Sequence, residues 1–143
     1  MGKPASFAIT TALTAVGAAT VITLGAGCQV DSSEKVPTAA DLKGTWAQTG
    51  AGYERGASVT WENQTVVIEN ADGQGFTGFK EYTREGEPPH KEMVNGVIGA
   101  DGDILITDDD GQFRGRFNDG KIAGQYAEVG NDSAAINVEL SRK

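Results

Sequence analysis

The chain has 143 residues, of which 20 are acidic and 12 basic, and its formal net charge is −8 at pH 7. A surface of this charge repels phosphate backbones, which argues against nucleic acid as a partner and favours high solubility or a cationic partner. Cys28 is the only cysteine and His90 the only histidine, so an intrachain disulfide is excluded and most histidine-dependent catalytic groupings are disfavoured.

Residues 1–27 have the layout of a secretory signal. One cation, Lys3, precedes a long run without charged residues, and small side chains stand directly before Cys28. This arrangement predicts a cleaved export signal. The stretch from Leu24 to Cys28 resembles the cleavage site of bacterial lipoproteins, which implies that the Cys28 thiol is acylated and that lipid anchors the exported protein to the bacterial cell membrane or outer membrane.

The match to that cleavage site is incomplete. Lipoproteins favour Leu or a similar residue three positions before the Cys, where this chain has Gly25. The alternative is that Cys28 is an incidental residue of a signal peptide or of an uncleaved anchor. Phe7 to Gly27 is long enough to cross a bilayer of about 30 Å, although its content of Gly, Ala and Thr makes it a poor span.

Residues 28–41 are polar and include one Pro, which predicts a flexible tether. A short helical turn over Thr38 to Leu42, with Thr38 as its cap, is compatible with this segment. The folded domain is expected from residue 42 to residue 143.

From Gly44 onward apolar and polar residues alternate, and turn signals rich in Gly, Asn and Asp interrupt the alternation. We therefore predict an all-β domain with strands near residues 44–48, 57–62, 65–70, 75–83, 92–99, 103–107, 112–117, 121–129 and 134–142. Whether Glu62-Asn63-Gln64 is a turn or a bulge decides between nine strands and eight. Many short strands with tight turns favour a small antiparallel up-and-down β-barrel.

A repeated pattern supports closure of the barrel. An apolar residue stands two positions before and two after a glycine in the segments 94–98, 113–117 and 122–126. Alternation places these positions on one face of each strand. Glycine within a strand indicates strong local bending or room for a large neighbour.

Gly44-Thr45-Trp46 opens the first predicted strand, and Arg142 has the parity to lie against Trp46 from the last one. This combination resembles the calycins (lipocalins, fatty-acid-binding proteins and avidins). The resemblance implies a structural role for Trp46 and Arg142 at one end of the barrel. Within this group, the segments Gly44-Thr45-Trp46 and Gly124-Gln125-Tyr126 are most similar to the avidin branch. Biotin binding in that branch uses several tryptophans around the ligand. This chain has only Trp46 and Trp61, so biotin is not expected as its ligand.

The glycine-bearing face is expected to point inward together with Phe76, Lys80, Tyr82, Phe113, Phe117, Ile122, Tyr126 and Glu128. Aromatic walls with a few polar groups suit a small apolar or amphipathic ligand. The predicted ligand-binding residues are Trp61, Lys80, Tyr82, Tyr126 and Glu128, and Lys80 and Glu128 could meet a polar ligand or each other.

The alternative is a barrel filled by its own side chains. Such a barrel would act through its loops and acidic surface as a protein-interaction or inhibitor module. An internal cavity of at least ~300 Å³ would favour the ligand hypothesis.

The sequence predicts neither a metal site, nor a cofactor, nor an enzyme. Asp108-Asp109-Asp110-Gly111 lacks EF-hand spacing, because Ile106 stands where the first acidic residue is needed, and it is interpreted as a hairpin turn with solvated neighbours. His90 lies in a predicted loop, and no Ser has the strand-turn-helix setting of a nucleophile.

Overall fold

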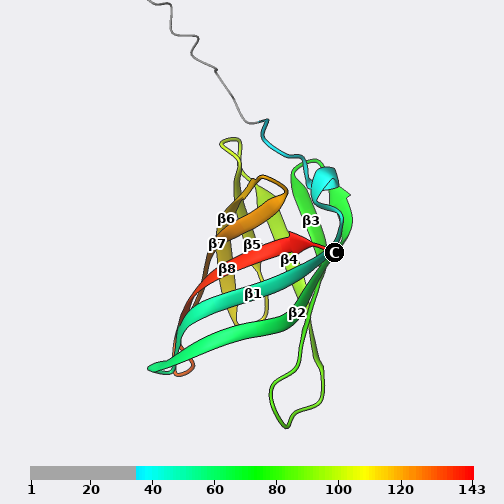
Figure 1. The fold of residues 1–143 in the computed structure, drawn as a ribbon. Coiled ribbons are helices and arrows are strands. Elements are labelled where there is room, and N and C mark those ends of the chain that lie inside the picture. Colours follow the sequence, from blue (N-terminus) through cyan, green and yellow to red (C-terminus); the bar gives the residue numbers. More distant parts are fainter. Residues whose placement is uncertain (1–34) are drawn as a thin grey trace, which may run out of the picture. The chain divides into compact units, whose positions relative to one another are not determined.

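The protein folds into a closed antiparallel barrel in which each strand pairs with the next and β1 pairs with β8 (Figure 1). The structure is a computed structural model, and it describes residues 35–143. The elements are η1 (Ala39–Leu42), β1 (Gly44–Glu54), β2 (Ala57–Asp72), β3 (Gly75–Tyr82), β4 (His90–Ile98), β5 (Asp103–Thr107), β6 (Gly111–Asn118), β7 (Lys121–Glu128) and β8 (Ala134–Arg142). The predicted all-β up-and-down barrel is confirmed, with eight strands.

The two strands expected at 57–62 and 65–70 are one strand, because Glu62-Asn63-Gln64 forms a bulge and not a turn. Gln48 pairs with Gln64, whereas Gly50 pairs with Trp61, so β2 contains one more residue than β1 across this step. Asn63 adopts φ 58°, a left-handed conformation that Asn tolerates better than most residues. The bulge bends β2 without interrupting its pairing.

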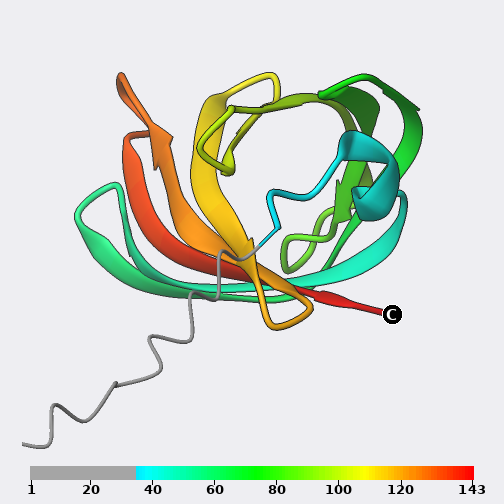
Figure 2. The ribbon, with the colours of Figure 1, turned by 90° about the horizontal axis from the view of Figure 1, so that it is seen from above.

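One end of the barrel is closed by η1. Thr38 caps the helix, and its side chain and that of Asp41 form a reciprocal capping box. Ala39 and Leu42 are fully buried on its inner side, and Figure 2 shows η1 within the ring of strands, next to β2 and β3. The helical turn is confirmed, but residues 38–41 differ from the expected tether: they belong to the folded domain, because two apolar side chains three positions apart meet the core together.

Trp46 and Arg142 meet at this closed end. They pair across β1 and β8, and the Arg142 guanidinium lies 4.4 Å from the Trp46 ring centroid. The guanidinium also donates hydrogen bonds to the carbonyls of Asp41 (2.6 Å) and Lys43 (2.8 Å), and the indole N–H donates to the Leu42 carbonyl (2.9 Å). Arg142, at the end of β8, thus connects η1 to the paired strands β1 and β8.

The repeated glycines make room for aromatic side chains and for close backbone contact. A Cβ on Gly96 would lie 2.1 Å from Cζ of Phe76, and one on Gly124 would lie 2.1 Å from the carbonyl oxygen of Arg114. Gly115 and Gly124 are direct partners across β6 and β7. At these positions the glycines permit tight packing on the inner face, which is the second of the two roles considered for them.

The remaining end of the barrel carries the β1–β2, β3–β4, β5–β6 and β7–β8 connections, and we call it the open end. Up-and-down connectivity places these alternate connections together, opposite η1 and the other turns (Figure 1).

In the part of the chain that the structure describes, no helix is long and apolar enough to cross a membrane. The predicted signal and Cys28 lie outside the described residues.

Candidate functional site

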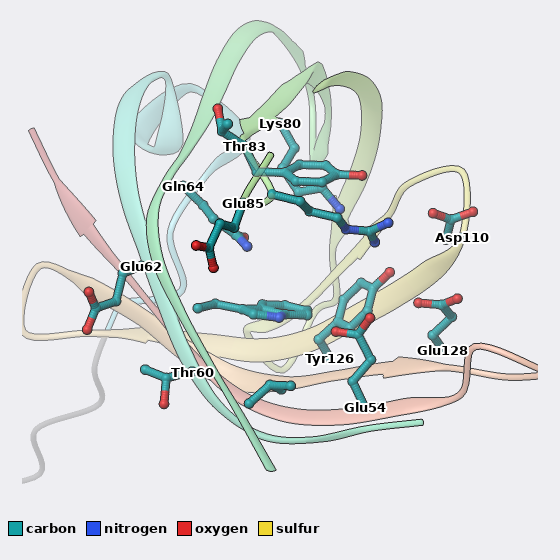
Figure 3. Close-up of a pocket in the computed structure, with 14 residues that line it drawn as sticks. Glu54, Thr60, Glu62, Gln64, Lys80, Thr83, Glu85, Asp110, Tyr126 and Glu128 are labelled. Carbon is teal, nitrogen blue, oxygen red and sulfur yellow. The ribbon is translucent and has the colours of Figure 1, made fainter. Parts of the chain in front are cut away.

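A cavity of about 330 Å³ opens between the strand ends at the open end of the barrel (Figure 3). Its volume lies in the range of small-molecule sites. All five predicted ligand-binding residues line it, drawn from β2, β3 and β7. The lining residues are Glu54, Val59, Thr60, Trp61, Glu62, Gln64, Lys80, Tyr82, Thr83, Arg84, Glu85, Asp110, Tyr126 and Glu128.

Aromatic rings form part of the cavity wall. The rings of Trp61 and Tyr126 meet edge to face, with centroids 5.3 Å apart and an interplanar angle of 64°. Tyr82 stacks on His90 at 5.1 Å, and His90 also lies 2.8 Å from a carboxylate oxygen of Glu87. These contacts hold the two ends of the β3–β4 loop together beside the cavity.

The base of the cavity is a cluster of buried charges, Lys80, Glu92 and Asp108, which we call the ion cluster. Lys80 Nζ lies 2.5 Å from Asp108 Oδ2 and 2.9 Å from Glu92 Oε2. The side chains of Lys80, Glu92 and Asp108 are only 11%, 12% and 6% exposed, respectively. Lys80 therefore pairs with Glu92 and Asp108 and not with Glu128. The carboxylates of Glu92 and Asp108 lie on the inner face of the barrel at the same depth as the Lys80 ammonium.

Two tyrosines complete the ion cluster. The Tyr82 hydroxyl donates to Glu92, and the Tyr126 hydroxyl donates to Asp108 Oδ1 at 3.2 Å. The Lys80 ammonium lies 5.2 Å from the Tyr82 ring centroid and 5.5 Å from that of Tyr126. A cation between two ring faces and two carboxylates is well compensated for its loss of water.

The electrostatics of the ion cluster favour its charged form. Burial alone would lower the pKa of Lys80, but the charges of Asp108 and Glu92 more than offset it and raise that pKa. Burial opposes ionisation of Asp108, yet the Lys80 charge and the N–H groups of Gly111 and Asp110 hold its pKa below the ordinary value. Burial, followed by the neighbouring carboxylates, raises the pKa of both Tyr82 and Tyr126.

Glu92 and Asp108 are site residues that the sequence interpretation missed. The interpretation of Asp108 as part of a solvated turn is wrong for that residue: its carboxylate accepts hydrogen bonds from the Gly111 N–H at 2.8 Å and from Lys80. A signal was present, since Asp108 continues the inward alternation of Ile104 and Ile106, and Glu92 that of Val94 and Ile98. Among residues 35–143, no group of three or more His, Cys, Asp or Glu is arranged to hold a metal ion.

Below the ion cluster the barrel is packed. A void of only about 20 Å³ remains between Lys80, Asp108, Tyr126 and the apolar side chains beneath them, which is about the space of one water molecule. The buried apolar residues of this half include Ile68, Ile104, Ile122 and Leu140. The barrel is thus solid toward η1 and hollow at the open end.

Glu128 stands at the rim of the cavity in a negative environment. Burial, and then the charges of Asp110, Asp132 and Glu54, raise its pKa. Figure 3 shows Glu54, Asp110 and Glu128 on the Tyr126 side of the cavity, with Glu85 on the other side next to Gln64 and Glu62 directed away. The rim therefore disfavours a further negative charge.

Comparison with known proteins identifies the fold and no family. No protein family matches the chain, and no curated protein resembles it significantly. A redesigned β-barrel is 13% identical with a TM-score of 0.60, over 74% of this chain and 95% of its own. A protein of unknown function from Bacteroides ovatus is 13% identical with a TM-score of 0.53, over 72% of this chain and 42% of its own.

A zebrafish ileal bile acid-binding protein in complex with cholic acid is 19% identical with a TM-score of 0.39, over 71% of this chain and 97% of its own. The likeness to the redesigned barrel shows the fold of this chain, and at 13% identity neither that protein nor the Bacteroides ovatus protein shows more than the fold.

Proposed function

We propose that the barrel binds a small apolar or amphipathic molecule in the cavity at its open end and has no catalytic role. The observation that carries this proposal is that Trp61, Lys80, Tyr82, Tyr126 and Glu128, from three strands, all line one cavity of about 330 Å³. Edge-to-face rings give an apolar ligand contact area, and the polar groups at the cavity base and rim orient it.

Native mass spectrometry of the protein purified from its own host tests this function. We expect a co-purifying molecule of defined mass on the wild-type chain. Trp61→Ala should lose it, because the indole forms part of the wall. Tyr53→Ala is the matched control, since Tyr53 is 64% exposed and lies outside the cavity lining. Unliganded protein from the wild type, or equal retention by both variants, would contradict the proposal.

We further propose that the protein is exported and anchored to the bacterial cell membrane or outer membrane through lipid on Cys28, which keeps the cavity near a membrane. The support is the uncharged run and the small residues before Cys28. Cys28→Ser should move the protein from the membrane fraction to the soluble fraction, and should remove label from protein grown with radioactive palmitate. A variant that still fractionates with membranes would disprove acylation as the anchor.

The second candidate is an interaction or inhibitor module that acts through the loops and acidic surface. The packed half of the barrel, with its void of about 20 Å³, favours it. In that case the wild type would co-purify with a protein, and Trp61→Ala would leave that complex intact.

A further inference from the structure

The charges that line the cavity are unbalanced. Five carboxylates and two cations, Lys80 and Arg84, are among the lining residues, and of the five carboxylates only that of Glu62 is directed away from the cavity (Figure 3). Within residues 35–143, none of the five carboxylates takes part in an ion pair. The five are Glu54, Glu62, Glu85, Asp110 and Glu128.

Two of the three nearby cations are paired with carboxylates, and Arg84 stays in the cavity lining against the ring of Tyr82. Lys80 lies between Asp108 and Glu92 in the ion cluster, so its charge is already neutralised there. The Arg84 guanidinium lies 5.5 Å from the Tyr82 ring centroid. Arg55, in the adjacent β1–β2 turn, pairs with Asp132 at 2.8 Å. An anionic ligand entering the cavity would therefore meet a rim of uncompensated carboxylates.

The negative rim adjoins the aromatic wall. Glu54 and Glu128 lie beside Tyr126 in Figure 3, and the Tyr126 ring contacts Trp61 edge to face at 5.3 Å. Carboxylates beside Trp and Tyr rings suit organic cations, because ring faces attract a positive charge and also pack against the apolar groups that carry it. The same cavity thus offers an apolar surface and a negative field side by side.

From this arrangement we infer that the ligand is an organic cation, an amine or quaternary ammonium with an apolar or aromatic body. The inference rests on the proposed binding function and adds the sign of the ligand's charge. The body packs against Trp61 and Tyr126, and the cationic group lies toward Glu54, Asp110 and Glu128.

Three probes with one aromatic body and different charges test the inference: benzyltrimethylammonium, benzyl alcohol and phenylacetate. Each is titrated into the purified full-length chain by isothermal calorimetry at low and high salt. We expect the cation to bind about tenfold more tightly than the other two, since an exposed ion pair contributes about two- to fivefold and several carboxylates act together. Salt should weaken binding of the cation alone.

Variants separate the charge from the cavity. Glu54→Gln and Glu128→Gln should each weaken cation binding about two- to fivefold and leave benzyl alcohol unchanged. Glu69→Gln is the control for net charge, since it removes a carboxylate too, but one that is exposed on β2 and lies outside the cavity lining. Trp61→Ala should weaken all three probes, because it removes part of the wall.

The outcomes distinguish this inference from the proposed function. Equal binding of the three probes, or tighter binding of phenylacetate, would overturn the cationic ligand and leave the binding function standing. An equal effect of Glu69→Gln and Glu128→Gln would also overturn it, since net charge and not the rim would then be responsible. If the folded wild type, checked by circular dichroism, binds no probe, both are overturned.

Discussion

Replacing Lys80 by Met would test how much the ion cluster contributes to the free energy of unfolding of the barrel. Lys80 is the only cation within 4 Å of Glu92 or Asp108 among residues 35–143, and both carboxylates are nearly buried. Met has a similar length and volume, so the change removes the charge without leaving a large cavity. Removing one partner of a buried pair costs about 3–5 kcal/mol of unfolding free energy at pH 7.

The cost should depend on pH in a specific direction. In the wild type the pKa of Asp108 is lowered, so its contribution to stability is present above its unfolded pKa of about 3.9 and is lost as pH falls through the folded value. In Lys80→Met, burial dominates and the pKa of Asp108 rises above the unfolded value. The variant therefore gains stability as pH falls, and the deficit narrows toward pH ~4.

Urea denaturation of both proteins between pH 4 and 8, followed by tryptophan fluorescence, measures this deficit. Lys91→Met is the matched control: Lys91 lies on the exposed side of β4, 3.5 Å from Glu81 with its side chain 59% exposed, and its loss should cost less than about 1 kcal/mol. A Lys80→Met deficit as small as that of the control, or one that stays constant on acidification, would refute the reasoning.

Three further changes probe the closed end, the glycine face and the rim. Arg142→Lys should lower the unfolding free energy by about 1–3 kcal/mol in thermal or urea unfolding, because an ammonium cannot lie flat on Trp46 and reach two carbonyls together. Gly96→Ala should cost about 1–3 kcal/mol, since its Cβ would overlap the Phe76 ring, and Phe76→Leu added to it should restore part of the loss. Affinity for benzyltrimethylammonium should fall on acidification through the raised pKa of Glu128, and Glu128→Gln should flatten that dependence in calorimetric titrations.

Turn chemistry is why the strands could be predicted from the sequence. Asp119 and Gly120 adopt φ values of 49° and 78°, the left-handed conformations that a tight hairpin turn requires and that Asp-Gly favours. The boundaries of β6 and β7 follow directly from this turn. Thr38 likewise marks the start of η1, because a Thr with Asp three positions later can satisfy two backbone N–H groups.

The bulge in β2 could not be decided from the sequence. Glu62-Asn63-Gln64 is polar and contains Asn, which suits both a turn and a left-handed residue within a strand. The choice depends on the partner: β1 extends to Glu54 and continues to pair with β2 beyond the bulge. The pairing of β1 with β2 beyond the bulge is a tertiary contact, and the residues around Asn63 alone carry no information on it.

The ion cluster was missed because a local pattern treats a charged side chain as exposed. Burial of a carboxylate is costly unless a partner compensates it, and the partner of Asp108 is 28 positions away in the chain. Alternation placed Lys80 on the inner face, and the same rule applied to Glu92 and Asp108 would have placed two anions beside it. The five predicted cavity residues could be found from the sequence because Trp61, Tyr82 and Tyr126 are aromatic, and because alternation placed Lys80 and Glu128 on the inner face with the two tyrosines.

The level at which the ion cluster lies explains how one small barrel can hold both a core and a cavity. An eight-stranded barrel is just wide enough for its own side chains, and below Lys80 they fill it. At the level of Lys80 the interior becomes polar. Glu92 and Asp108 fix the two tyrosine hydroxyls and the Lys80 ammonium, so these groups need no apolar side chain above them to hold them in place. Stability then depends on residues at or below the cluster, and the rim carboxylates above it are free to serve binding. Glu54→Gln should accordingly change ligand affinity and leave the unfolding free energy within about 0.5 kcal/mol of the wild type, whereas Lys80→Met should change both.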